Sequence, residues 1–156
     1  MKFVSLLAAA LALSACADPS GTVAPPAPVA ISQVNIQVDN VAGTVDVWLT
    51  VENTYDKHLS DLSIHLVPRD ETGRLIEGAH LELQAARPIK AGEKIGPVRV
   101  TAATQGHRVS CIELYHVRAV LPDHSIHFVS GPGTADLLDA EPAGLCRAAA
   151  SAQAAI

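Results

Sequence analysis

Apolar and polar residues alternate along most of the chain between residues 31 and 130. Apolar side chains occupy every second position of 34–38, 45–51 and 62–66, and most positions between them are polar. This period of two, with its many valines and isoleucines, is typical of strands that bury one face. Further strands are predicted near Leu75 and over residues 81–83, 95–101, 112–121 and 125–129. Seven or eight short strands of this kind predict an all-β fold, an antiparallel sandwich.

Short runs of turn residues separate the predicted strands. Residues 40–43, 70–73 and 90–93 each contain a glycine, which tolerates the positive φ that many turns require. Pro122, Asp123 and His124 stand between the last two strands and predict a hairpin turn. The regular spacing of these turns favours the sandwich over a helical domain.

Segments of different composition lie on both sides of the alternating region. Residues 16–30 are rich in proline, alanine and other small residues and show no apolar period. Such a segment favours an extended tether of about 3.1 Å per residue. We therefore predict a sandwich domain over residues 31–134 and an alanine-rich, partly helical tail over residues 135–156.

The first sixteen residues have the pattern of an export signal. Lys2 gives a positive charge, residues 3–13 are almost purely apolar, and this run is too short to span a bilayer. The sequence Leu13-Ser14-Ala15-Cys16 resembles the lipobox of bacterial lipoproteins. The resemblance implies that residues 1–15 are a signal peptide and that Cys16 carries the lipid, including palmitate. The alternative is an ordinary signal peptide that is cut nearby and leaves Cys16 unmodified.

Two further consequences follow from the lipoprotein resemblance. The residue after Cys16 is alanine, and in enterobacterial lipoproteins such a residue favours delivery to the outer membrane. An exported protein meets oxidising conditions, so the two remaining cysteines, Cys111 and Cys146, are expected to form a disulfide. This disulfide would close a loop of about 35 residues, which contributes about 3.8 kcal/mol to the free energy of unfolding in the loop-entropy model. The alternative is a reactive cysteine, which needs a base and a low pKa that the sequence does not show.

The middle of the chain resembles the FxLYD group of immunoglobulin-like domains found in bacterial envelope proteins. The likeness spans residues 34–101 and rests on the motifs in residues 51–53, 62–66, 70–73 and 91–93. It implies an immunoglobulin-like sandwich that is used for interaction and not for catalysis. Val67-Pro68-Arg69 stands where that group has an aromatic residue. Because Pro68 cannot donate a ladder hydrogen bond, we expect an edge or a bulge there. An exposed edge near Pro68 is one of the two expected docking surfaces.

Trp48 is the single tryptophan of the chain. The alternation places it on the face opposite Val45, Val47 and Leu49. One interpretation is that the alanine-rich tail covers this second face. The other is an exposed aromatic anchor for a partner, since tryptophan is enriched at binding hot spots.

Seven histidines raise the question of a metal site. His116, His124 and His127 are the best candidates, because they fall on or beside one predicted hairpin. No CxxC, HExxH or methionine-rich motif accompanies them. Scattered surface histidines are one interpretation, and a periplasmic copper- or zinc-binding lipoprotein is the other.

Charge and motif content exclude several function classes. The net charge is −5 without a basic cluster, which argues against nucleic acid and against a polybasic membrane patch. No G-x-S-x-G nucleophile motif is present, so we predict neither an enzyme nor a cofactor. The sequence predicts a periplasm-facing, outer-membrane lipoprotein whose sandwich docks another protein of the cell envelope, a structural, assembly or accessory role.

Overall fold

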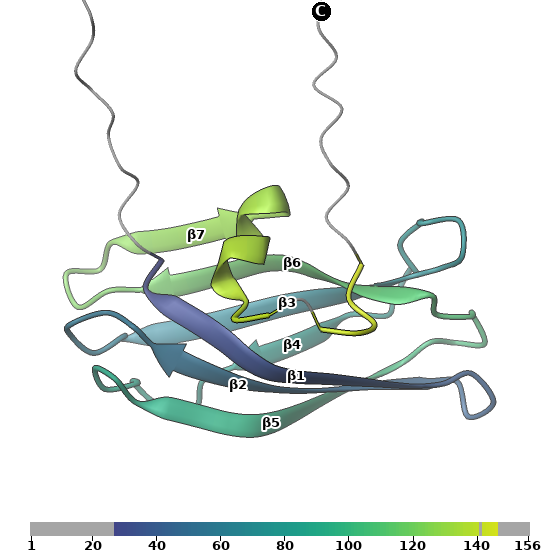
Figure 1. Cartoon of the computed structure of the whole chain (residues 1–156), viewed down its shortest axis with the longest axis horizontal. Helices are drawn as coiled ribbons and strands as arrows, with labels where there is room; N and C mark the ends of the chain where they lie inside the picture. The colour runs from purple at the N-terminus through teal and green to yellow at the C-terminus, as the bar shows by residue number, and fades with distance from the viewer. Residues whose placement is uncertain (1–26, 141, 147–156) are drawn as a thin grey trace, which may run out of the picture.

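Seven strands carry the described part of the chain, residues 27–140 and 142–146 of a computed structural model. They are β1 (Val29–Asp39), β2 (Thr44–Asn53), β3 (Asp61–Arg69), β4 (Leu81–Gln84), β5 (Lys94–Ala103), β6 (Cys111–Val120) and β7 (Ile126–Ser130), followed by a 3₁₀ helix, η1 (Gly131–Leu137). Hydrogen bonds join them into two antiparallel sheets, ordered β1-β2-β5 and β4-β3-β6-β7. The chain crosses between the sheets three times, after β2, β4 and β5 (Figure 1). The fold is thus the predicted antiparallel immunoglobulin-like sandwich.

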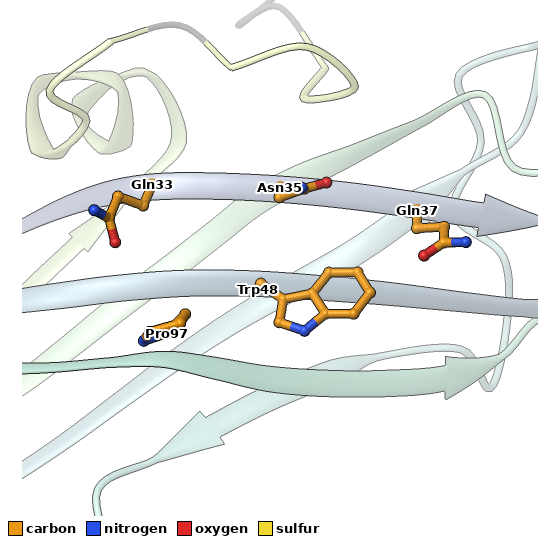
Figure 2. Close-up of a pocket in the computed structure, with 5 residues that line it drawn as sticks. All are labelled: Gln33, Asn35, Gln37, Trp48 and Pro97. Atoms are coloured by element: carbon orange, nitrogen blue, oxygen red, sulfur yellow. The ribbon is translucent and has the colours of Figure 1, made fainter.

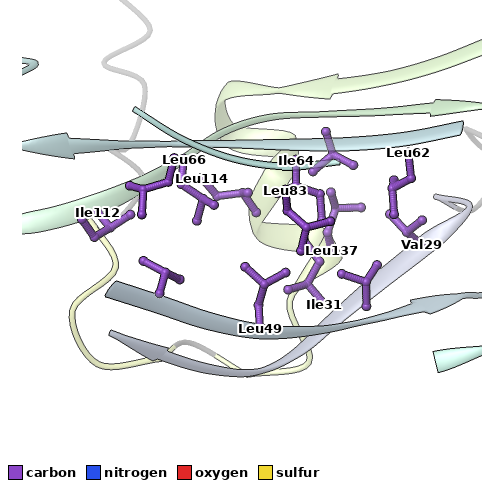
Figure 3. Packing of buried hydrophobic residues seen from close by; sticks show 14 of the residues in the cluster. Val29, Ile31, Leu49, Leu62, Ile64, Leu66, Leu83, Ile112, Leu114 and Leu137 are labelled. Atoms are coloured by element: carbon purple, nitrogen blue, oxygen red, sulfur yellow. The ribbon is translucent and has the colours of Figure 1, made fainter. Parts of the chain in front are cut away.

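The core lies between the apolar faces of the two sheets (Figure 3). Alternate residues of β2 point into it, and Val45, Val47, Leu49 and Val51 are all buried. The opposite sheet contributes leucines and isoleucines of β3, β4 and β6. Each such side chain stabilises the fold by about 1.5–3 kcal/mol when it leaves water. The residues between them on β2, Trp48 among them, are therefore held on the outer face of the three-stranded sheet.

The predicted turns are present. Gly73 donates its N–H to the carbonyl oxygen of Asp70 at 3.0 Å, and the N–H of Glu93 reaches the carbonyl of Lys90 at 3.0 Å. Leu75 does not belong to a strand and makes only an isolated bridge to Arg69. The sandwich therefore has seven strands in the described residues.

Asn53 ends β2 and ties two loops together from a fully buried position. Its side-chain Nδ2 donates to the carbonyl oxygens of Lys57, Ile89 and Lys90 at 2.8–3.0 Å. Its Oδ1 accepts the backbone N–H of Tyr55 at 2.9 Å. A buried amide that satisfies this many backbone groups fixes the conformation of the loops on both sides.

The segment after β7 belongs to the folded unit. Leu137, at the end of η1, is buried in the core. Leu138 then forms a parallel bridge with Ile31, and Leu145 forms one with Ile112. The folded unit thus continues beyond residue 134, where the sequence alone placed its end, because these leucines complete the apolar core.

The N-terminal end of the unit also begins earlier than the sequence indicated. β1 starts at Val29, which is buried, and Pro28 accepts a hydrogen bond from the backbone of Thr54 at 3.0 Å. The predicted signal peptide, most of the predicted tether and the last part of the predicted tail lie outside the described residues. No helix in the described residues is long and apolar enough to cross a membrane.

Candidate functional site

The outer face of the three-stranded sheet carries a groove. It is lined by Gln33, Asn35 and Gln37 of β1, Trp48 of β2 and Pro97 of β5, it is open to solvent, and its volume is about 470 Å³. Figure 2 shows the indole of Trp48 lying along the sheet, with the three amide side chains on one side and Pro97 on the other. We call these five residues the Trp48 groove.

Strand pairing explains why the groove residues meet. Trp48 lies directly opposite Asn35 of β1 and Arg99 of β5, so their side chains share the outer face. The inward neighbours Val47 and Leu49 are fully buried or nearly so, and this fixes the register of β2. Trp48 itself is half-buried and Asn35 is exposed.

A β-bulge brings Gln33 into the groove. The pairing of β1 with β2 shifts between Ser32 and Asn35, and Gln33 has a φ of 52°, which is uncommon for a residue other than glycine. The hydroxyl of Thr50 donates to the side-chain Oε1 of Gln33 at 2.9 Å and holds it. The –NH₂ of Gln33 is therefore left to donate elsewhere.

Gly96 shapes the opposite side of the groove. The pairing of β2 with β5 shifts between Leu49 and Val51, and Gly96 approaches the β2 backbone there with a φ of 127°. A Cβ atom at Gly96 would lie 2.7 Å from the carbonyl oxygen of Leu49. Only glycine allows the two strands to come this close, and the next residue, Pro97, projects beside Trp48 (Figure 2).

The charged residues around the groove are paired with one another. Arg99 donates to both carboxylate oxygens of Asp46, at 2.9 and 2.7 Å, and its guanidinium lies 5.4 Å from the centre of a Trp48 ring. The hydrogen bond from Arg99, with a further one from Thr101, lowers the pKa of Asp46 below its usual range. Lys94 pairs with Glu52 at 3.0 Å. The charges of these four residues therefore cancel in pairs.

Of the two predicted partner-binding residues, only Trp48 lies on an accessible surface. Trp48 lines the groove. The expectation of an exposed edge at Pro68 is wrong, because Pro68 is buried in β3, an inner strand of its sheet. It pairs with Ile112 of β6, and its carbonyl oxygen accepts the N–H of Ile76 at 3.1 Å, so the following loop covers it.

The candidate histidines do not converge on one point. His127 pairs with the buried Ala119 and leans toward the core side of its sheet, whereas His116 lies on the outer side. His124 sits in the hairpin turn with a φ of 67°. In the part of the chain that the structure describes, no group of three or more His, Cys, Asp and Glu side chains could hold a metal ion.

His116 instead belongs to an aromatic row on the outer face of the four-stranded sheet. Its ring stacks on that of His65 at 4.1 Å and lies 5.0 Å from that of Phe128. Burial lowers the pKa of His116, and the neighbouring His65 lowers it further, while Glu82 acts in the opposite direction. A carboxylate oxygen of Glu82 lies 3.2 Å from Nε2 of His65. The row favours the neutral imidazole of His116.

The predicted cysteine pairing is present. Cys111, the first residue of β6, forms a disulfide with Cys146. The backbone N–H of Cys146 also donates to the carbonyl oxygen of Ile112 at 2.8 Å. Cys16, the predicted lipid site, lies outside the described residues.

Sequence reasoning found Trp48 but missed the rest of the groove. Asn35 and Gln37 were visible as polar positions of an alternating strand, and two amides in such positions are a signal that could have found them. Gln33 and Pro97 had no comparable signal, because bulges and strand register place them in the groove.

Comparisons with known proteins give only weak structural likenesses. No protein-family model and no curated protein sequence matches the chain. The chain is similar to a β-glucuronidase from glycoside hydrolase family 2, with 14% identity and a TM-score of 0.38 over 61% of this chain and 10% of that one. It is also similar to IrmA from Escherichia coli, with 17% identity and a TM-score of 0.36 over 73% of this chain and 93% of IrmA.

Proposed function

We propose that this protein is a periplasm-facing lipoprotein of the outer membrane whose sandwich domain recognises another component of the cell envelope. The observation that carries the recognition role is the Trp48 groove, an open site with an aromatic ring at its centre. Binding sites of this kind combine an apolar surface with a few polar groups that fix orientation. The groove lies on a rigid sheet, which lowers the cost of ordering side chains on binding.

Two features support the envelope location. The first sixteen residues resemble a lipoprotein signal that ends at Cys16. The disulfide between Cys111 and Cys146 fits an oxidising compartment. Two or three acyl chains on Cys16 would hold the protein at the membrane, because each buried CH₂ contributes about 0.8 kcal/mol. Confinement near the partner then raises its effective concentration at the groove.

The anchoring part is tested by the intact mass of protein extracted from its native host. We expect a chain that begins at Cys16 and carries the added mass of a diacylglycerol and an amide-linked acyl chain. The Cys16→Ala variant should lose this mass and leave the outer-membrane fraction. A mature chain without acyl mass would contradict the proposal.

The recognition part is tested by crosslinking in native envelopes. We expect Trp48→Ala to reduce capture of the partner component while the melting temperature stays nearly unchanged. The matched control is Phe128→Ala, which removes an exposed aromatic ring from the opposite sheet. Equal capture by both variants would place the interaction on another surface.

A further inference from the structure

The indole of Trp48 is arranged as a platform. Figure 2 looks onto the outer face of the three-stranded sheet and shows the ring nearly face-on. The side chain is half-buried, and the guanidinium of Arg99 lies 5.4 Å from the centre of one of its rings. The part of the indole that lines the groove is the part open to a ligand. Flat apolar ligand surfaces with polar rims stack on such rings. The C–H faces of pyranose rings are surfaces of this kind.

The amide side chains supply the polar half of the site. Gln33, Asn35 and Gln37 follow one another along β1, and the four residue steps from Gln33 to Gln37 correspond to about 14 Å of regular strand. Each carboxamide both donates and accepts hydrogen bonds. Sugar hydroxyl groups have the same double capacity, and the acetamido group of an N-acetylated sugar can exchange two bonds with a carboxamide. A row of amides beside an aromatic platform thus matches a short saccharide chain.

The charge distribution selects a neutral ligand. The acidic residues Asp46 and Glu52 are each paired with a basic residue across β2 and β5. None of the five residues of the Trp48 groove carries a formal charge. Arg99, the cation beside Trp48, is paired with Asp46. An anionic ligand and a cationic ligand would each lack a charged partner there.

The composition of the groove argues against a protein partner as its occupant. A stable protein interface buries about 800 Å² on each partner, around an apolar centre of several residues. The Trp48 groove has one aromatic residue and one proline among three amides. The exposed aromatic rings of Tyr115 and Phe128 lie on the four-stranded sheet, so they do not enlarge the apolar surface of the Trp48 groove.

We propose that the Trp48 groove binds a glycan chain that contains N-acetylated hexosamines, an inference that rests on the proposed recognition function and narrows its partner. Trp48 stacks on one sugar ring, and Asn35 and Gln37 hydrogen-bond its acetamido and hydroxyl groups. Gln33, held by Thr50, donates its –NH₂ to the neighbouring ring.

The test uses the single tryptophan as its own reporter. The protein as purified from its native host, in a detergent without a sugar headgroup, is titrated with the N-acetylglucosamine tetrasaccharide. We expect a saturable change of tryptophan fluorescence with a Kd below about 1 mM. Cellotetraose, which has the same backbone without acetamido groups, should bind at least about fivefold more weakly, because the carboxamides lose partners.

Variants separate the groove from the rest of the surface. Asn35→Ala and Gln37→Ala should each weaken binding by about threefold to tenfold, the loss expected for one hydrogen bond. Trp48→Ala, followed by calorimetry because it removes the reporter, should abolish measurable binding. Phe128→Ala should bind as the parent protein does.

Three outcomes would overturn the inference. One is the absence of saturation up to about 10 mM tetrasaccharide, and another is unchanged binding in Trp48→Ala. The third is a Trp48-dependent crosslink to a protein that the tetrasaccharide does not displace. Failure of the lipid measurement at Cys16 alone would leave saccharide binding intact, so the two failures are distinguishable.

Discussion

Asn53 is the residue whose removal we expect to cost most stability among the polar side chains described. Replacement by alanine would remove the Asn53 donor from the carbonyl oxygens of Lys57, Ile89 and Lys90. Ile89 and Lys90 would keep only their backbone donors. We predict that Asn53→Ala lowers the free energy of unfolding by about 2–4 kcal/mol, measured by urea denaturation. The exposed Asn35→Ala is the control and should change it by less than about 0.5 kcal/mol.

Two features of Gly96 exclude a side chain: its positive φ and its close approach to the backbone of β2. In Gly96→Ala the new Cβ would lie 2.7 Å from the oxygen of Leu49 and 2.8 Å from the Cα of Thr50, both backbone atoms. We predict a loss of more than about 2 kcal/mol in unfolding free energy. Gly73→Ala, with a φ of 77° and no atom within 4 Å of its Cβ, should lose only about 1 kcal/mol. Equal losses would show that only the backbone conformation matters.

His116 should make stability depend on pH. Its pKa is lowered in the folded protein, from an ordinary value of 6.5, so the unfolded chain binds the proton more readily. The stabilising contribution of the neutral ring is therefore complete above about pH 6.5 and is lost as the pH falls toward the lowered folded pKa.

The measurement is the free energy of unfolding at about pH 8 and about pH 5. The decrease toward the lower pH should be smaller in His116→Gln than in the parent protein, because the variant lacks this group. The exposed His58→Gln should retain the full decrease. An identical decrease in all three proteins would rule out a role for His116.

At the level of elements, the disulfide attaches the last described segment to β6. Two backbone hydrogen bonds, from Ile112 to Gly144 at 2.9 Å and from Cys146 to Ile112 at 2.8 Å, lie beside it. The double variant Cys111→Ala/Cys146→Ala should therefore keep the sandwich but lose up to about 3.8 kcal/mol of unfolding free energy, because a closed loop with a sequence separation of 35 is opened. Reduction of the parent protein by dithiothreitol should lower its melting temperature, and the variant should be insensitive to the reductant.

The strands could be predicted from the sequence because one side of each sheet faces the core. Alternation located β1, β2 and β3, and glycine-containing turns located their ends. The prediction of a strand near Leu75 was wrong, because an isolated apolar residue in a turn-rich stretch has no ladder to join. Pro68 was placed on an exposed edge for lack of information about the loop that covers it.

The Trp48 groove could be predicted only in part, because it depends on how the strands pair. Local pattern gives the face on which Trp48 lies, but the neighbours of that face come from other strands. The bulge at Gln33 and the close approach at Gly96 depend on the pairing of β2 with both β1 and β5. Contacts of this kind are set by tertiary packing and leave little trace in a single sequence.

At the scale of the whole molecule, anchoring and recognition are carried by separate parts of the chain. The proposed lipid site at Cys16 precedes the folded unit, and the Trp48 groove is formed entirely within it. We predict that Cys16→Ala, although released from the membrane, binds the N-acetylglucosamine tetrasaccharide with the parent Kd. A large change in Kd, measured by tryptophan fluorescence, would mean that the lipid or the tether contributes to the site.

The hydrogen bonds that hold the N-terminal end of β1 determine where a pulling force acts on the domain. Under the proposed anchorage, any pull between the membrane and the domain enters the fold at Ala27. There the side-chain hydroxyl of Thr54 donates to the Ala27 carbonyl at 2.9 Å, and further along the strand Asp139 donates its backbone N–H to Ile31 at 3.1 Å. These two hydrogen bonds are made by the N-terminal end of β1 and the residues just before it, and most of the β1–β2 pairing follows them along the strand. A pulling force acts first on these two hydrogen bonds and on the one from the Thr54 N–H to Pro28, before it reaches the part of β1 that carries the groove amides.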